Sequence, residues 1–538
     1  MGQENTLTIL LFWIPQAIEQ LLLWVYWWQT KEYRIDRFQV LFYTFEGRKN
    51  LGLSSIAIKL AILGVSYYWG NYLLLFAFFS FLDINFLLNI VRHKVRRPVF
   101  TLRAKELFAT GIFGVLLVVL LVWGGFADFV FTLTLGELFV LLAPIVGIIW
   151  TSPLVFISKI RAIGHAKKVL STVKPIVIGV TGSYGKTTTK EFIAHLLSFK
   201  YKVVKTEKSE NTEFGVARRI VDSLKKGTQM LVVEIGAYRR GEIRRVANIV
   251  RPQLAIVTGV EPQHFALFGS LEAINKAKYE LVQSLPDKGL AIFNYSNQQC
   301  RIVARWARRD GKTVVGYELN GKGRREKGEG RREKASVVAR ILSADYKGVT
   351  FEVSEGDKKP KNLFAPVPGV HFVENLTGAI LVARKLGVNW VQIAKGCKTL
   401  VVPEGTMTLR QNRKLTIIDD SYNSTPLGFI SAIEYLSLLD TEEKVVITPG
   451  IIELGKLSDR IHQDLGRRMA HVVDRIILTN SDVAKSFKKG LGSRARILEI
   501  VENADSLAQS INNLVNKKSV VLIEGRIPQK MMDFFKKK

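Results

Sequence analysis

The chain has 538 residues and a formal net charge of +30, with 77 lysines and arginines against 47 aspartates and glutamates. No nucleic-acid-binding motif accompanies this charge, so we expect no nucleic acid partner and favour a basic surface attracted to anionic lipid. The two cysteines, Cys300 and Cys397, lie far apart without partners at metal-ligand spacing, which indicates a reducing compartment and argues against a disulfide framework.

The first 160 residues contain apolar segments, most of them near the ~20 residues that an α-helix needs to cross a bilayer. These segments are 7–28, 51–69, 72–91, 106–126 and 129–157. The first segment is too long, and too close to other spans, to be a cleaved signal peptide. We therefore expect a membrane α-helical region of about five helices at 1–160, followed by a linker at 161–173.

The loops between these segments predict the orientation, because loops rich in lysine and arginine stay on the cytoplasmic side. Loops 29–50 and 92–105 are rich in basic residues, whereas the connections near 70–71 and 124–128 have none. Five spans then place the N-terminus outside and everything after Ile160 in the cytoplasm. We expect a multi-pass protein of the cell membrane that contacts the lipid bilayer.

A few charged residues interrupt the predicted spans. Lys59 and Asp83 lie at similar depths in two segments that form a tight hairpin, so we hypothesise an ion pair, since an unpaired charge there is costly. Glu19 is an alternative partner for Lys59, and snorkelling of Lys59 alone is an equally open interpretation. Glu137 has no evident partner.

From Pro175 the sequence alternates short β-rich runs with helical stretches such as 187–199 and 271–285, which is typical of parallel βαβ units in an α/β fold. The expected strands are 175–180, 230–237, 254–260, 289–294, 414–420, 444–450, 475–480 and 519–525. They indicate two α/β domains, at 174–400 and 401–538. The strongly charged stretch 321–335 is expected to be a disordered surface loop of the first domain.

The clearest motif is GVTGSYGKTTTKE at 179–191, where an apolar strand leads into a glycine-rich turn and then a helix. Backbone N–H groups of such a turn bind phosphate oxygens, and Gly182 and Gly185 permit the close approach. Lys186 is expected to neutralise phosphate charge, and Thr187 to offer its hydroxyl to Mg²⁺. The generic Walker A spacing is not met, so a chance Gly-Lys-Thr turn is the alternative, but the order of strand, turn and helix favours a phosphate loop.

The spacing T-G-S-x-G-K-T-T resembles the phosphate loop of the Mur ligase family, and further family motifs follow in order over about 175–535. They are an asparagine-rich segment at 211–216, a strand end with Glu234 at 232–243, a segment with His264 and Lys278 at 263–281, a helix start with His371 and Asn375 at 366–379, D-D-S-Y-N-S-T-P at 419–426 and I-E-L-G at 452–455. The resemblance implies a P-loop Mur-type central ATPase domain and a C-terminal Rossmann-like α/β domain. The membrane region takes the place of the family's UDP-sugar-binding domain.

The resemblance also implies ATP and Mg²⁺ as cofactors, together with a set of site residues. The implied catalytic residues are Lys186, Glu234, His264 and Lys278, and the implied metal ligands are Thr187, Glu234, His264 and Lys278 once carboxylated by CO₂. The implied ATP contacts are Gly182, Ser183, Gly185, Lys186, Thr187, Thr188, Asn294 and Asp420. The implied substrate contacts are Asn211, Thr212, Tyr422 and Asn423.

Within the family, the motifs most resemble the branch that adds D-alanyl-D-alanine to a muramyl-peptide precursor in peptidoglycan synthesis. This implies an ATP-dependent, ADP-forming acid–amino-acid ligase that works through an acyl phosphate, with a soluble UDP-linked or a lipid-linked acceptor. The alternatives are another amino-acid ligase of the family, of polyglutamate type, and a nucleotide-binding membrane scaffold without catalysis. Three positions depart from the family pattern: Phe372 follows His371, Thr406 replaces an arginine, and Glu524-Gly525-Arg526 replaces Lys-Gly-Ser-Arg.

Overall fold

The structure is a computed structural model, and its chain divides into two compact units, Met1–Ile160 and Arg161–Lys538. The structure describes residues 3–43, 51–91, 95–125, 128–207, 210–237, 239–261, 268–320, 334–412, 414–422, 424–451, 454–501, 504–511, 514, 518–528, 531–533 and 535. The residues 321–333 of the predicted disordered loop therefore lie outside the described part of the chain.

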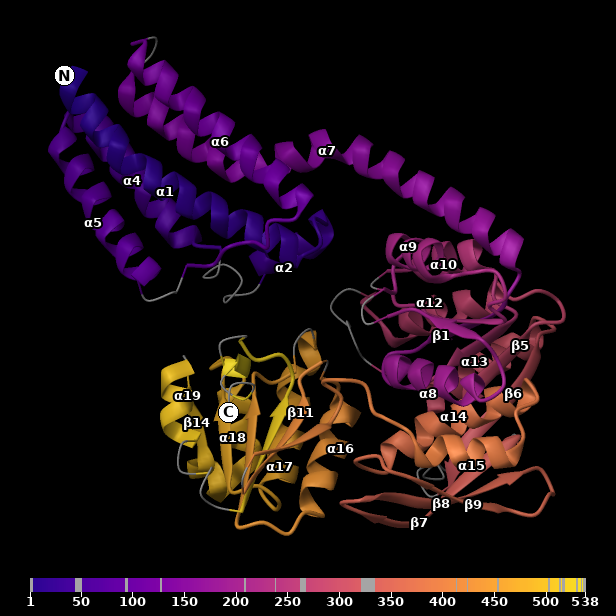
Figure 1. Ribbon diagram of the computed structural model, residues 1–538. Coiled ribbons are helices and arrows are strands. Elements are labelled where there is room, and N and C mark those ends of the chain that lie inside the picture. The colour runs from indigo at the N-terminus through magenta and orange to yellow at the C-terminus, as the bar shows by residue number, and fades with distance from the viewer. Residues whose placement is uncertain are drawn as a thin grey trace. The chain divides into compact units, whose positions relative to one another are not determined.

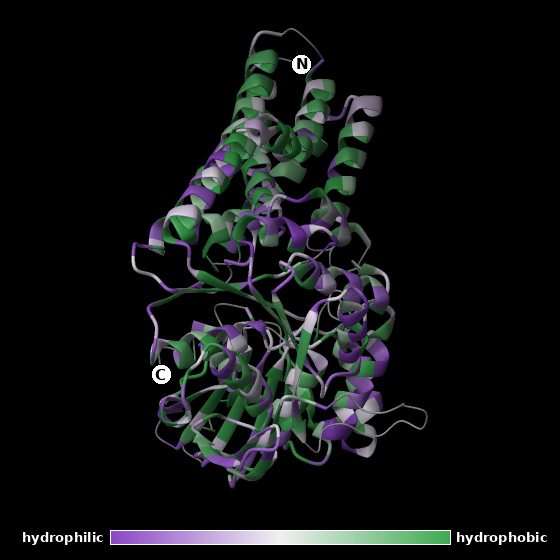
Figure 2. Cartoon of the chain, turned by 90° about the vertical axis from the view of Figure 1, so that its right-hand side faces the viewer, coloured by the Kyte–Doolittle hydropathy of each residue, from purple (hydrophilic) through white to green (hydrophobic). Residues whose placement is uncertain are grey.

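The first unit is a bundle of apolar helices (Figure 1), and most of its length is coloured as hydrophobic in Figure 2. Among the described residues, four helices are long and apolar enough to cross a membrane. They are α1 (Gln3–Thr30), α5 (Tyr72–Val91), α6 (Leu102–Trp123) and α7 (Phe129–Val173). The remaining expected span, 51–69, forms α4 (Leu53–Trp69), a shorter apolar helix of 17 residues. The short helix α2 (Ile35–Tyr43) was not predicted.

The charged residues of the first unit, Met1–Ile160, pair differently from the prediction. Lys59 is only 3% exposed, and its Nζ lies 3.4 Å from Glu137 Oε1 and 3.1 Å from Gln20 Oε1. Asp83 instead accepts a hydrogen bond of 2.7 Å from Gln16. The predicted Lys59–Asp83 ion pair is therefore wrong, because a similar depth in the bilayer does not fix the direction in which a side chain leaves its helix.

The residues expected to form a linker, 161–173, are the last turns of α7. They belong to the second unit, where Ala166 is fully buried and Ile163 and Leu170 pack against the hydrophobic core. This end of α7 is thus part of the α/β unit rather than a loose connection.

A nine-stranded sheet forms the larger part of the second unit, in the order β2-β3-β1-β4-β5-β6-β7-β8-β9. Neighbouring strands are parallel from β2 to β7, and β8 and β9 add an antiparallel extension. The strands are β1 (Ile176–Thr181), β2 (Val203–Lys205), β3 (Met230–Glu234), β4 (Leu254–Val257), β5 (Leu290–Asn294), β6 (Thr313–Asn320), β7 (Val337–Asp345), β8 (Gly348–Glu355) and β9 (Lys361–Ala365).

Helices cover both faces of this sheet (Figure 1). Along β1, Ile178 and Val180 enter one hydrophobic core and Val177 enters the other, as the two-residue period of a strand requires. The first core also contains residues of α8 (Lys186–Ser198), α14 (His371–Lys385) and α15 (Trp390–Lys398). The second core contains residues of α9 (Glu213–Ser223), α10 (Glu242–Val250), α12 (Leu271–Gln283) and α13 (Gln298–Arg309). A parallel sheet buried on both faces explains why its strands read as continuous apolar runs.

A second sheet of six strands follows, in the order β10-β11-β15-β12-β13-β14, with β10 antiparallel and the others parallel. The strands are β10 (Thr408–Asn412), β11 (Leu415–Asp420), β12 (Glu443–Thr448), β13 (Arg475–Leu478), β14 (Leu498–Ile500) and β15 (Ser519–Glu524). The helices are α16 (Pro426–Ser437), α17 (Ser458–Met469) and α18 (Ala484–Leu491) on one face, and α19 (Ala504–Ile511) on the other. The expected fold class, membrane helices followed by α/β sheets, is confirmed.

Both cysteines are buried and free in this fold. Cys300 lies on α13 and Cys397 on α15, and each side chain is fully buried in a hydrophobic core. They pack as small apolar groups.

Candidate active site

The residues that carry chemistry gather at the carboxyl ends of the central strands of the nine-stranded sheet. β1 lies between β3 and β4, and Val180 stands opposite both Glu234 and Ile256. Since parallel strands end at a common edge, the turn after β1 and the acidic end of β3 are neighbours there. Ligands of open α/β sheets bind at this edge.

The turn after β1 is packed so closely that two of its positions accept only glycine. A Cβ on Gly182 would lie 2.1 Å from Thr258 Oγ1, and a Cβ on Gly185 would lie 2.3 Å from Asn375 Oδ1. Gly185 also has φ of +71° as the N-cap of α8. Ser183 fixes the turn to the end of β4, because its N–H donates to the carbonyl of Gly259 at 2.7 Å.

Lys186 is the first residue of α8, and its side chain folds back over the turn. Its Nζ donates to the carbonyl of Ser183 at 3.1 Å. Burial lowers the pKa of Lys186, and the carboxylate of Glu234 acts in the opposite direction. A lysine cation above a glycine turn, with a helix N-terminus behind it, fits a polyphosphate.

Thr187 and Glu234 fit a magnesium ion that is bound together with a nucleotide. Thr187 Oγ1 donates to Glu234 Oε2 at 2.9 Å, and Lys190 Nζ lies 3.6 Å from the same carboxylate oxygen. In the described part of the chain, no group of three or more histidine, cysteine, aspartate or glutamate side chains is suited to hold a metal. Mg²⁺ typically uses one or two protein carboxylates and completes its shell with phosphate oxygens and water, so these two residues fit it.

Lys278 lies on α12 and is only 4% exposed. It has no hydrogen bond or ion pair with any residue that the structure describes. Burial and, next, the ammonium of Lys186 lower the pKa of Lys278 to about 7. A large fraction of its amine is therefore neutral and nucleophilic near pH 7. His264, which was expected nearby, lies outside the described residues.

Asn294 ends β5 at the same sheet edge, but its amide is already engaged. Asn294 Nδ2 donates to the carbonyl of Thr258 at 2.8 Å and to Glu374, and its Oδ1 accepts from Ser296 N–H at 2.9 Å. The side chain is fully buried. An ATP contact by Asn294 therefore requires the exchange of one of these bonds.

The remaining predicted contacts of the middle domain lie on α8 and α9. Thr188 is buried on α8. Thr212 caps α9 by accepting a hydrogen bond from Gly215 N–H at 3.3 Å, and a Cβ on Gly236 would lie 3.1 Å from Asn211 Nδ2. Thr212 is thus committed to the helix start, while Asn211 lies beside the glycine that follows β3.

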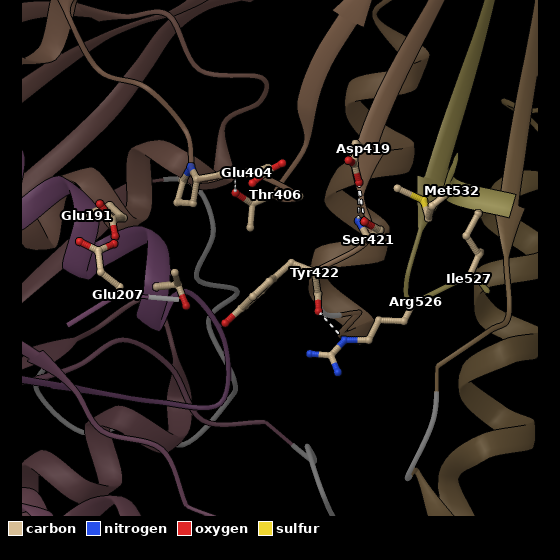
Figure 3. A pocket seen from close by; sticks show the side chains of 13 residues that line it. Glu191, Glu207, Glu404, Thr406, Asp419, Ser421, Tyr422, Arg526, Ile527 and Met532 are labelled. Carbon is tan, nitrogen blue, oxygen red and sulfur yellow. Dashed lines mark hydrogen bonds between the residues drawn. The ribbon is translucent and has the colours of Figure 1, made fainter. Parts of the chain in front are cut away.

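A cavity of about 520 Å³ separates the start of α8 from the second sheet (Figure 3). Tyr422 lies on its wall, where the Tyr422 N–H donates to the carbonyl of Gly405 at 2.9 Å. The other predicted contact of this loop, Asn423, lies outside the described residues. The lining residues are Thr187, Glu191, Glu207, Pro403, Glu404, Gly405, Thr406, Asp419, Ser421, Tyr422, Arg526, Ile527 and Met532.

Of the two aspartates that end β11, Asp419 lines this cavity and Asp420 lies behind it. Asp420 is buried, accepts a hydrogen bond of 3.1 Å from Met407 N–H, and stands opposite Glu524 of β15. Burial raises the pKa of Asp420 to about 7, and burial together with Asp420 raises the pKa of Glu524 well above its ordinary value. Ser424 Oγ donates to Glu524 at 2.6 Å. We infer that at least one of these two carboxyl groups is protonated at neutral pH.

Several lining residues were not predicted from the sequence, notably Glu191, Glu207, Glu404 and Arg526. Glu191 had an available signal, because it lies one helical turn after Thr187 in the phosphate motif. Arg526 had another, because it follows the glycine at the end of a buried strand.

Comparisons with known proteins identify the family to which the chain belongs. The Mur ligase middle domain matches residues 180–383, and the Mur ligase glutamate ligase domain matches residues 407–527. The chain belongs to the Mur ligase family. Proteins to which it is similar include MurF enzymes, and the chain is an ATP-dependent, ADP-forming acid–amino-acid ligase of the MurF-like kind.

Two curated relatives bear the name UDP-N-acetylmuramoyl-tripeptide–D-alanyl-D-alanine ligase. The Synechocystis protein is 29% identical over 64% of this chain and 73% of its own length, and the Bacillus subtilis protein is 26% identical over 69% and 77%. MurF from Acinetobacter baumannii has a similar structure, with a TM-score of 0.61 and 25% identity over 71% of this chain and 81% of that chain. MurF from Thermotoga maritima, solved with ADP, shares the fold at a TM-score of 0.60 and 24% identity over 71% and 84%.

Proposed function

We propose that this chain uses ATP to join D-alanyl-D-alanine to a muramyl-peptide precursor in peptidoglycan synthesis. The observation that carries the proposal is the hydrogen bond of 2.9 Å between Thr187 and Glu234 beside the phosphate turn, at one wall of the large cavity. The substrates are those in the names of the relatives from Synechocystis and Bacillus subtilis.

An amide does not form from a carboxylate and an amine at a useful rate, so the acceptor carboxylate is first activated. Its oxygen attacks the γ-phosphorus of ATP, the bond to the bridging oxygen breaks, and ADP leaves with an acyl phosphate formed. The donor amine then attacks the carbonyl carbon and loses a proton, and inorganic phosphate leaves with the electron pair of the C–O bond. The protein contributes positioning and neutralisation of charge.

In this reaction Lys186 would neutralise phosphate charge, and Thr187 and Glu234 would hold Mg²⁺. When bound, Mg²⁺ withdraws negative charge from the phosphate oxygens. His264 near the metal, Asn294 and Asp420 at ATP, and Asn211, Thr212, Tyr422 and Asn423 at the substrates stay predictions.

Lys278 has a separate role in the proposal. Its neutral amine nitrogen adds to the carbon of CO₂ and loses a proton, which gives a carbamate with two oxygens beside Lys186. Burial and the pKa of about 7 support this, because only the free amine reacts. The test is ¹³C NMR of the protein in labelled bicarbonate, where we expect a carbamate signal that Lys278→Ala removes. A spectrum without such a signal would refute carboxylation.

The membrane unit leads us to place the enzyme at the cell membrane, with the N-terminus outside and both α/β domains in the cytoplasm. We further propose that the acceptor is lipid-linked. The support is that the chain spans only 73% and 77% of two relatives named for a UDP-linked acceptor and carries apolar helices instead. Equal or better use of the soluble UDP-linked acceptor in a direct competition would count against this.

The decisive assay uses the full chain in detergent with ATP, Mg²⁺, each acceptor and a panel of amino donors, with the product read by mass. We expect ADP release that requires both substrates, and a product heavier by D-alanyl-D-alanine. A product that contains L-glutamate would favour the polyglutamate-type alternative. Absence of any product, with ATP unconsumed, would sink the proposed function.

A further inference from the structure

The cavity beside the phosphate turn has an uneven distribution of charge. Four acidic side chains line it, and among its described lining residues Arg526 is the single basic one. The acidic residues are Glu191, Glu207, Glu404 and Asp419. Figure 3 shows Glu191 and Glu207 on one wall and Arg526 on the other, beside Tyr422.

Most of the acidic lining is already matched by cations. Glu191 pairs with Lys205 and with Lys190, the latter at 3.2 Å. Arg410 lies 3.6 Å from Glu404 and 3.7 Å from Asp419. The negative charge of the cavity is therefore largely balanced within the protein.

Arg526, in contrast to most of the acidic lining residues, has no partner of opposite charge among the described residues. Its Nε donates to the carbonyl of Tyr422 at 3.1 Å, and the side chain is exposed. In the described part of the chain it has no carboxylate partner, so its two terminal nitrogens stay available. A guanidinium held at Nε with both terminal nitrogens open matches the two oxygens of a carboxylate.

The local fold explains why the cation stands at this position. β15 ends at Glu524, whose fully buried side chain accepts a hydrogen bond from Ser424. Gly525 then turns the chain with φ of +83°, and its N–H donates to the carbonyl of Asp420 at 3.1 Å. A buried acid thus precedes the glycine, and Arg526 follows it directly. The turn carries the cation from the sheet into the cavity.

We propose that Arg526 binds the free carboxylate of the amino donor and thereby selects donors with a carboxylate at the end remote from the reacting amine. The proposal rests on the proposed function and identifies the subsite for one of its substrates. The amine end then lies toward the wall of Thr187, where the acceptor is activated. An extended dipeptide spans about 7 Å, which a cavity of this size accommodates.

The experiment compares D-alanyl-D-alanine with its C-terminal amide as donors for the full chain, with kcat and KM measured for donor and ATP. With the wild type we expect the amide to have a KM about 10- to 100-fold higher, because it cannot accept a bidentate charged pair. In Arg526→Ala the KM of the acid should rise by a similar factor and the preference for the acid should vanish. Arg526→Lys should recover part of it.

Arg467→Ala is the matched control, because Arg467 is exposed on α17 and pairs with Asp464. It should leave all constants unchanged. A rise in the KM of ATP without a change for the donor would assign Arg526 to nucleotide phosphate and overturn the inference. So would an Arg526→Ala variant that still prefers the acid. A wild type that releases no ADP with any donor would instead refute the proposed function itself.

Discussion

The N-terminal helical unit and the α/β unit each bury a lysine on a helix, but the charge of that lysine is compensated in only one of them. Lys59 is 3% exposed and lies against Glu137 and Gln20, so its charge is compensated. Lys278 is 4% exposed and has no ion pair among the described residues, and its pKa is lowered to about 7. A buried pair holds helices together, whereas a buried amine without a partner is available for chemistry.

The largest effect is expected at Lys186, the half-buried lysine whose charge we assign to a substrate rather than to the protein. Lys186→Ala should lower kcat/KM for ATP by about 10³-fold, because preorganised charge at the transferring phosphoryl group is lost. ADP release measures it. Lys202→Ala, which removes an exposed lysine, is the control and should be silent. A comparable loss in the control, or none in Lys186→Ala, would contradict the assignment.

The next effect tests the compensated lysine. Lys59→Met leaves Glu137 buried without its cation, so the membrane unit should lose about 3–5 kcal/mol of stability. Thermal unfolding in detergent measures this. The double variant Lys59→Met with Glu137→Gln should recover most of the loss, since no isolated charge remains. If Lys59→Met were as stable as the wild type, the charge of Lys59 would not stabilise the fold and the contrast with Lys278 would fail.

The uncompensated lysine should respond with the opposite sign. The unfolded chain holds a proton on Lys278 up to its ordinary pKa of 10.5, whereas the folded chain releases it near 7. Lys278 therefore destabilises the fold fully below pH 7, and this destabilisation disappears as the pH rises from 7 to 10.5. Lys278→Met should therefore raise stability at pH 7 by about 1–3 kcal/mol. The gain should shrink as pH rises toward 10.5. A destabilised Lys278→Met would show that the amine has a structural partner.

The smallest effect concerns the buried acids of the second sheet. Asp420 has a pKa of about 7 in the fold against 3.8 ordinarily, so the folded state keeps a proton that the unfolded state releases. Its stabilisation is present at low pH and is lost as pH rises through about 7. Glu524 has a pKa raised well above its ordinary value by burial and adds to this dependence, so Glu524→Gln should flatten the slope between pH 5 and 8, a change of about 1 kcal/mol. Melting curves across that range measure it, and an unchanged slope would count against coupling.

The sequence predicted the central strands well, for a clear physical reason. β1, β3, β4 and β5 are buried on both faces and therefore appear as short apolar runs that end in turn signals. The antiparallel strands β7–β9 were not predicted from the sequence. They form a partly exposed extension of the sheet, where polar residues alternate with apolar ones and no continuous apolar run appears.

The phosphate turn was predictable because its chemistry is local, with Gly182, Gly185, Lys186 and Thr187 in one short motif. The partner of Lys59 was not, because helix rotation in a bundle depends on packing that spacing does not encode. The same limit applies to Asp419 and Asp420, which are both buried although only Asp419 lines the cavity.

Because both cysteines are buried, the folded chain should react very slowly with thiol reagents. Burial raises the pKa of Cys397 to about 12 and that of Cys300 further still, so neither forms a thiolate at neutral pH. Since the sequence contains only these two, a cysteine introduced at the cavity rim would be labelled alone. Spectroscopic probes can therefore be attached on both sides of the cavity without first removing a native thiol, and the approach of its walls during turnover becomes directly measurable.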